Sequence, residues 1–277
     1  MKKIAASSML ALLLTLVSAC APSTQSNSGL QTSTASTEES SNIVGGTIVV
    51  PGSPLAKQVF MIYMVGANGG GICTATMVTE TVGLTAAHCM DGVRRGYAIF
   101  DIQAVKLLEN ASSREQLLKS PKVIQIKSVR VHPAWTGSIS RGNNGDVALF
   151  KLVRSKPSHI EVTQIHTEPL RPGQVVVASG YGVNTGSLSM GSGTLRETRL
   201  RVQEVNVTET EFSVDQRQRR GVCSGDSGGP SFVVSPFGRL KQVGIVSYGE
   251  EGCEVYGVYT YVTPFLQWMQ QAIRSMQ

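Results

Sequence analysis

Apolar residues along most of this chain come in short runs and not at helical spacing. Between about residues 43 and 263, Val, Thr, Ser and Gly fill short segments with little sustained helical periodicity. Runs of this kind are typical of β-strands joined by turns. After Pro264 the pattern changes, and four apolar side chains share one helical face: Phe265, Trp268, Met269 and Ile273. We therefore expect an all-β body and a short C-terminal helix over residues 264–274.

The first residues have the pattern of an export signal. Two lysines are followed by residues 4–19, which carry no charge and are rich in Leu. This stretch is short for a membrane-spanning helix, so residues 1–19 are interpreted as a secretory signal peptide. Its end reads Val-Ser-Ala and then Cys20, which resembles the bacterial lipobox, where cleavage precedes a Cys that is then lipidated. The alternative is an ordinary signal peptide followed by an incidental Cys.

Residues 20–42 differ in composition from the rest of the chain. Eleven of the 22 residues from 21 to 42 are Ser or Thr, and Leu30 is the only large aliphatic residue among them. A segment with so little apolar surface cannot offset its ordering entropy, so we expect a flexible tether and propeptide. Folded sequence is expected to begin at Ile43.

Composition and charge narrow the classes of function. The 277 residues are 41% hydrophobic, which excludes a wholly disordered chain and a protein with many membrane spans. The formal net charge is +6 without a long basic run, so nucleic acid is not expected as a partner. Five cysteines are an odd number, and a lipid on Cys20 would leave four to pair in an oxidising compartment. The chain is expected to be an exported lipoprotein of the bacterial cell envelope.

Three separated segments carry the candidate chemistry. His88 follows the run 84–87, Asp146 opens the apolar run 147–150, and Ser227 lies in the string Gly-Asp-Ser-Gly-Gly-Pro. A Ser hydroxyl is a weak nucleophile, and a neighbouring His, with an unperturbed pKa of about 6.5, can accept and return its proton. A carboxylate can hold that imidazole in the required tautomer. Together the segments predict nucleophilic catalysis by Ser227.

The order of these segments, with Ile-Val-Gly-Gly from Ile43 at the start of the folded region, resembles the chymotrypsin/trypsin family of serine proteases. The resemblance covers residues 43–277. It implies two antiparallel six-stranded β-barrels, over residues 43–162 and 163–263, with the catalytic groups in the cleft between them. It also implies endopeptidase activity on protein or peptide substrates, no cofactor or metal, and a monomer.

The resemblance assigns roles to individual residues. His88 would be the general base, Asp146 its orienting carboxylate and Ser227 the nucleophile. The backbone N–H groups of Gly225 and Ser227 would bind the oxyanion. The four remaining cysteines would pair as Cys73–Cys89 and Cys223–Cys253.

Members of the family are activated by a cut just before the Ile-Val-Gly-Gly start. The freed α-amino group, here of Ile43, would pair with Asp226, since a buried carboxylate needs a charge partner. The residue before the cut is Asn42 and not the Lys or Arg of many relatives, so an activating protease of unknown type is expected. If the lipid on Cys20 is the only attachment to a membrane, the same cut would release the enzyme.

Four small or apolar residues are expected to form the primary specificity pocket. Gly221 stands where trypsin-like members carry Asp, and the other three positions are Val222, Gly249 and Gly257. Such a pocket would be wide and mostly apolar. It favours a large apolar or aromatic side chain before the scissile bond.

Two alternatives stay open. One of the acidic residues Glu250, Glu251 and Glu254 could fold into the pocket and receive Lys or Arg, although a solvated acidic rim is the favoured interpretation. The chain could also be an inactive homologue that serves as a binding module. Such proteins usually lose a triad member, whereas all three are present here.

Overall fold

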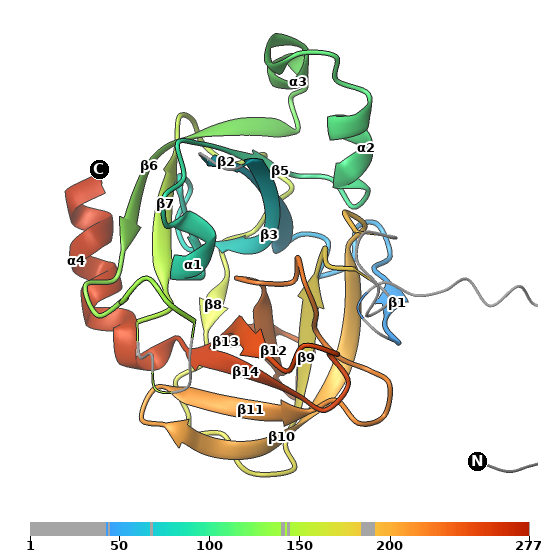
Figure 1. Cartoon of the computed structure of the whole chain (residues 1–277), viewed down its shortest axis with the longest axis vertical. Helices are drawn as coiled ribbons and strands as arrows, with labels where there is room; N and C mark the ends of the chain where they lie inside the picture. Colours follow the sequence, from blue (N-terminus) through green and yellow to red (C-terminus); the bar gives the residue numbers. More distant parts are fainter. Residues whose placement is uncertain are drawn as a thin grey trace, which may run out of the picture. The chain divides into compact units, whose positions relative to one another are not determined.

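Figure 1 shows the chain as a computed structural model, which describes residues 43, 45–66, 69–139, 142, 145–183 and 192–276. The chain divides into two units, residues 1–38 and 39–277, and all described residues lie in the second. The expected signal peptide, the lipidation site Cys20 and the tether 20–42 lie outside the described residues. None of the described helices is long and apolar enough to cross a membrane.

The first part of the folded region closes into an antiparallel barrel. Its six strands are β2 (Val59–Gly66), β3 (Gly69–Met77), β4 (Val82–Thr85), β5 (Arg95–Ile99), β6 (Val123–Val131) and β7 (Ala148–Leu152). They close in the order β2-β3-β4-β7-β6-β5. The short apolar runs become strands because the barrel buries them: β4 is buried at every position, and Phe60 and Phe150 fill the interior.

A second barrel follows along the chain. Its six strands are β9 (Val175–Gly180), β10 (Arg196–Thr208), β11 (Glu211–Asp215), β12 (Pro230–Val234), β13 (Leu240–Gly249) and β14 (Tyr256–Tyr261). Because β9 pairs with both β10 and β12, the ring closes as β9-β10-β11-β14-β13-β12. The expected fold of two six-stranded barrels is confirmed.

Two short strands join the second barrel from outside its ring. β8 (Gln164–Ile165) pairs with β13, and β1 (Thr47–Ile48) pairs with β10. The range expected for the first barrel included residues 47–48, but in the structure they extend the second. Pairing with β10 is what satisfies the backbone of β1.

The expected C-terminal helix is α4 (Leu266–Met276), which begins after the 3₁₀ turn η1 (Thr263–Phe265). Its apolar face packs on the core of the first barrel through Met269 and Met276. Two more helices, α2 (Ala104–Glu109) and α3 (Arg114–Lys119), lie between β5 and β6. The sequence pattern did not predict them, since six residues are too few to display a helical period.

Buried polar groups join the two barrels. Thr76 on β3 donates a hydrogen bond to Oε1 of Gln242 on β13, at 2.7 Å. The hydroxyl of Tyr181, just after β9, donates to the carbonyl of Asp101, just after β5, at 2.9 Å. Buried groups of this kind lose free energy when unpaired, so these bonds hold the barrels in one arrangement. Residues of both barrels can therefore form a single site.

Candidate active site

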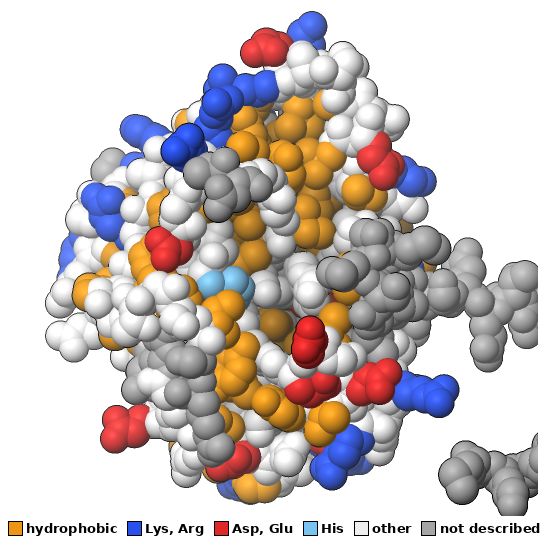
Figure 2. All heavy atoms as spheres, viewed as in Figure 1, with side chains coloured by type: hydrophobic (Ala, Val, Ile, Leu, Met, Phe, Trp, Pro, Cys, Tyr) orange, Lys and Arg blue, Asp and Glu red, His pale blue; other side chains and the backbone are white. Residues whose placement is uncertain are grey.

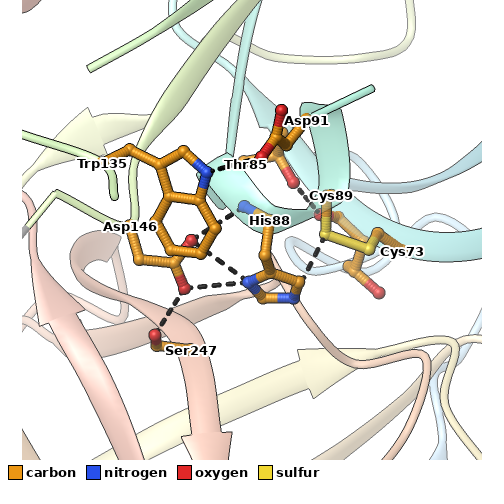
Figure 3. A network of polar contacts seen from close by, with 9 residues as sticks. Cys73, Thr85, His88, Cys89, Asp91, Trp135, Asp146 and Ser247 are labelled. Atoms are coloured by element: carbon orange, nitrogen blue, oxygen red, sulfur yellow. Dashed lines mark hydrogen bonds and ion pairs between the residues drawn. A yellow bond between two sulfur atoms is a disulfide. The ribbon is translucent and has the colours of Figure 1, made fainter. Parts of the chain in front are cut away.

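His88 lies on α1 (Ala87–Met90), a single turn that follows β4. Its backbone N–H donates to Oδ1 of Asp146 at 3.0 Å, and its ring Nδ1 lies 2.8 Å from Oδ2 of the same carboxylate (Figure 3). The next residue, Cys89, forms a disulfide with Cys73 on β3. The carboxylate of Asp146 and the disulfide therefore hold the short helix in place, and together they orient the imidazole of His88.

Asp146 is 1% exposed and lies just before β7. The hydroxyl of Ser247, on β13 of the other barrel, donates to its Oδ2 at 2.5 Å. Burial by itself would raise the pKa of Asp146, but the hydrogen bonds from His88 and Ser247 and the charge of His88 outweigh it. The pKa of Asp146 therefore lies below its ordinary value, and the carboxylate is ionised at neutral pH.

Ser227 is half-buried in the loop that leads to β12. Its carbonyl accepts the backbone N–H of Thr74 on β3, at 2.9 Å. The following Gly228 has φ +76°, and a Cβ there would lie 1.9 Å from Oγ1 of Thr85. The loop thus lies directly against Thr85 and Ala86, the segment that leads into the short helix of His88.

The reactive hydrogen bond is open in this structure. In the described part of the chain, the Ser227 hydroxyl makes no hydrogen bond, and Nε2 of His88 lies 3.7 Å from the sulfur of Cys89. Catalytic hydrogen bonds are often long in unliganded enzymes and tighten with substrate bound. The disulfide also explains why Cys73, His88 and Cys89, although close together, offer no pair of thiolates to a metal ion.

Two backbone donors point away from any partner. In the described part of the chain, the N–H groups of Gly225 and Ser227 donate to no other group, as an oxyanion site requires. Gly225 has φ +96°, and a Cβ there would lie 2.9 Å from the Cα of Gly182. Only glycine fits that conformation and that space.

Asp226, which lies between Gly225 and Ser227 in the sequence, is fully buried. The N–H groups of Gly182 and Cys223 donate to its carboxylate at 2.8 and 2.9 Å. No cation among the described residues pairs with it, and burial raises the pKa of Asp226 to about 7. The side chain of Ile43 is also fully buried, but no bond joins it to Asp226 in this part of the structure.

The structure adds Gln216 to the expected specificity pocket. A Cβ on Gly221 would lie 2.3 Å from Cδ of Gln216, and a Cβ on Gly257 would lie 2.7 Å from its Oε1. The carboxamide therefore lies against both glycines, in the space that their missing side chains leave. Its Oε1 accepts the N–H of Val222 at 2.8 Å, and its Nε2 donates to the carbonyls of Val222 and Cys253.

Gln216 carries no signal in the sequence, because it stands before a turn outside every motif. Its role comes from the path of residues 216–222 and from the Cys223–Cys253 disulfide, which brings the opposite wall of the pocket within reach. Both expected disulfides are present.

Figure 2 shows several acidic side chains on the same face of the molecule as the pale-blue histidine. The acidic residues expected at the pocket rim lie in the loop between β13 and β14. The carboxylate of Glu250 accepts the N–H groups of Gly252, Glu254 and Val255 in its own loop. Glu251 and Glu254 are exposed. This arrangement matches a solvated rim more closely than a carboxylate folded into the pocket.

Two further residues were not expected from the sequence: Trp135, beside His88, and Glu211, whose pKa is influenced by the charge of Asp146. The indole of Trp135 lies 6.4 Å from the His88 ring, between centroids, and donates to Asp91 at 3.0 Å (Figure 3). Glu211, on β11, is fully buried, and the hydroxyl of Thr208 donates to it at 3.0 Å. Burial raises the pKa of Glu211, and the nearby charge of Asp146 adds to that effect.

Known proteins are similar to this chain in sequence and in fold. The family model described as Trypsin matches residues 43–269. Chymotrypsin from Phaedon cochleariae is 27% identical over 247 residues, which cover 84% of this chain and 83% of the relative. Cathepsin G from Homo sapiens is 28% identical over 255 residues, covering 86% and 90%. A solved structure titled as HL collagenase has a TM-score of 0.66 at 19% identity, covers 83% of this chain and 98% of that one, and shows the same fold.

Replacing Ser247→Ala should lower stability at neutral pH and make stability less dependent on pH. The lowered pKa of Asp146 means that its ionised form stabilises the fold above the unfolded pKa of about 3.9, and that this contribution is lost as pH falls through the folded pKa. Loss of the Ser247 bond should lower the unfolding free energy at pH 7 by about 1.5–3 kcal/mol, and the deficit should shrink below pH 4 or so. Urea denaturation across pH measures it.

Ser231→Ala is the matched control, because Ser231 is a buried serine of the same barrel whose hydroxyl has no hydrogen-bond partner among the described residues. Its effect should not change with pH. A pH-independent deficit in Ser247→Ala would contradict the assigned role of this bond.

Proposed function

The chain belongs to the trypsin family of serine proteases, and we propose that it hydrolyses protein or peptide substrates through an acyl-enzyme formed on Ser227. One observation carries the proposal. The buried carboxylate of Asp146 is bound at once by His88 and Ser247, and the backbone next to Ser247 is bonded to the loop that holds Ser227, through Gly228 N–H and the carbonyl of Val246. The fold alone would not require that network, whereas acyl transfer does.

The chemistry follows from these groups. Nε2 of His88 takes the proton of the Ser227 hydroxyl as Oγ bonds to the scissile carbonyl carbon. The N–H groups of Gly225 and Ser227 stabilise the oxyanion. His88 then gives the proton to the leaving amine as the C–N bond breaks, and a water molecule repeats the sequence to free the acid. Asp146 keeps Nδ1 protonated throughout and stabilises the imidazolium.

An apolar primary specificity is proposed from the base of the pocket. Gln216 presents a neutral carboxamide there, and both its amide hydrogens are used by backbone carbonyls. A Lys or Arg side chain would meet no carboxylate, and Glu250 is held by its own loop. Burying an apolar side chain instead contributes about 1.5–3 kcal/mol.

Activation by cleavage between Asn42 and Ile43 is proposed from Asp226. This carboxylate is buried with backbone donors only, and its pKa of about 7 shows that burial without a cation disfavours its ionised form. A free Ile43 ammonium beside it would supply the missing charge. The ordered pair would then hold the adjacent Gly225 and Ser227 donors in place.

Membrane attachment is proposed from the N-terminal sequence. Cys20 would carry lipid, and both disulfides of the folded region pair cysteines beyond Ile43. No disulfide therefore joins the tether to the mature enzyme. Cleavage before Ile43 would both activate the enzyme and release it from the cell envelope.

The chain cleaved before Ile43 should cut after Phe, Tyr, Leu or Met at least about tenfold more efficiently than after Lys or Arg, a difference of about 1.4 kcal/mol. A peptide library with mass-spectrometric detection measures this, and Ser227→Ala is the control. Cuts that persist in the control would come from a contaminant. A preference for Lys or Arg would support the proposed catalysis but contradict the apolar pocket, and it would mean that an acidic side chain reaches the substrate side chain. Absence of both Ser227-dependent cutting and fluorophosphonate labelling would favour the binding-module alternative.

Cleavage should change how stability depends on pH. In the uncleaved chain the raised pKa of Asp226 means that the contribution of this carboxyl to stability is fully present below about pH 4 and is lost as pH rises through about 7. In the cleaved chain the ammonium of Ile43 should remove that loss. Chemical denaturation of both forms, each carrying Ser227→Ala, measures it. Asp226→Asn should abolish the difference and lower the activity of the cleaved enzyme by about 10²-fold or more; equal pH profiles for the two forms would refute the pairing.

Activation and release should coincide in cells that make the protein. Fractionation with N-terminal sequencing should find uncleaved chain in membranes and chain beginning at Ile43 in the soluble fraction. Cys20→Ser should abolish membrane attachment of the uncleaved chain. Active enzyme that begins at Ile43 and still carries its own lipid would rule the mechanism out.

A further inference from the structure

Thr74 lies on β3 of the first barrel and is fully buried against the nucleophile loop of the second. Its hydroxyl donates to the carbonyl of Gly225 at 3.1 Å and accepts the N–H of Tyr181 at 3.1 Å. A hydroxyl has one proton to donate, which here goes to Gly225, and it accepts the Tyr181 N–H through a lone pair. Both hydrogen bonds form only in one orientation of the side chain. It links two segments of the second barrel through the first.

Neighbouring contacts prevent Thr74 from turning away. Its backbone N–H donates to the carbonyl of Ser227 at 2.9 Å, and its carbonyl accepts the hydroxyl of Thr85 at 2.9 Å. Its Cβ would lie 3.0 Å from a Cβ placed on Gly229. Thr74 therefore contacts the nucleophile loop at three positions: Gly225, Ser227 and Gly229.

The carbonyl that Thr74 binds belongs to the residue whose N–H faces the oxyanion. Gly225 has φ +96° and no side chain to hold it, so its flanking peptides can rotate at low cost. In the described part of the chain, Thr74 is the hydrogen-bond partner of the Gly225 carbonyl. Without that bond, the carbonyl would be buried and unpaired, and rotation of Gly225 would relieve it.

We propose that Thr74 is a positioning residue for the oxyanion site: its hydroxyl holds the Gly225 carbonyl and so limits rotation about Gly225, which keeps the N–H group of the same residue directed at the developing negative charge. The other partner of the hydroxyl, Tyr181, precedes Gly182, whose N–H binds Asp226. The same side chain thus couples the wall around Asp226 to the donor at Gly225. This role rests on the proposed catalysis by Ser227, goes beyond the triad, and is assigned to a residue outside every motif of the sequence.

The test compares three variants in the form in which the wild-type chain is active. Thr74→Val keeps the shape and removes both hydrogen bonds, and Thr74→Ser keeps the hydroxyl. Thr76→Val is the matched control: Thr76 lies two residues further along β3, is equally buried, and also donates across the barrel joint, to Gln242. If loss of any hydrogen bond between the two barrels were enough to lower activity, Thr74→Val and Thr76→Val would lose activity equally.

Thr74→Val should lower kcat at least tenfold with KM changed less than threefold, while Thr74→Ser and Thr76→Val stay within threefold of the wild type. Affinity for a peptide aldehyde, whose adduct with Ser227 carries an oxyanion, should fall by the same factor as kcat/KM. Affinity for a product peptide with the same side chains should not change, because it makes no oxyanion.

Three outcomes would overturn the proposal: kcat of Thr74→Val within threefold of wild type, an equal loss in Thr76→Val, or equal losses of aldehyde and product affinity. If Thr74→Val does not fold, the same assays compare Thr74→Ser with Thr74→Ala, which differ by the hydroxyl. Equal rates for these two variants would refute the proposal. Wild-type and Ser227→Ala rates are measured first, so a failure of the proposed catalysis is seen separately from a failure of the role of Thr74.

Discussion

A single buried carboxylate organises the cleft. Asp146 is 1% exposed, and a charge in that setting is stable only when its surroundings satisfy it. Its partners come from both barrels: the backbone and ring of His88 from the first, and the hydroxyl of Ser247 from the second. The placement of β13 against α1 therefore depends on one ionised group, and the imidazole takes its orientation from the same group.

Space is the second constraint. The loop that carries Ser227 lies so close to β3 and β4 that a Cβ on Gly228 would overlap Thr85. Glycines in this loop are therefore required by close approach of the two barrels as well as by their positive φ. Because the loop and the first barrel touch so directly, a side chain such as Thr74 can hold the backbone of the other barrel.

Two buried polar groups beside the cleft show opposite solutions to burial. Gln216 is neutral, and all three of its hydrogen bonds are made to backbone groups, so it is stable at the base of the pocket. Asp226 receives only two N–H donors, and its pKa is raised to about 7. All hydrogen-bonding groups of the Gln216 carboxamide are thus satisfied, whereas Asp226 pairs with no cation among the described residues, and the proposed Ile43 ammonium would supply one.

Local patterns were sufficient for much of this protein. Short apolar runs identified a β fold, and the apolar face after Pro264 identified the C-terminal helix. Spaced motifs predicted His88, Asp146 and Ser227 as catalytic residues, and the structure brings the first two into contact. These features follow from burial along a strand or helix and from residue chemistry, both of which are written in neighbouring positions. The short helices α2 and α3 were missed because six residues carry no readable period.

Contacts between distant segments were beyond the sequence. Thr74 and Gly225 are 151 positions apart, and nothing around either residue indicates that closing two barrels would bring them together. Gln216 is near Gly221 in the chain, but only the path of the turn sends its carboxamide into the pocket. The sequence by itself determined which groups can do chemistry and in what order they occur. The tertiary structure decided which buried groups hold them in place, because pairing across a joint depends on packing and not on local pattern.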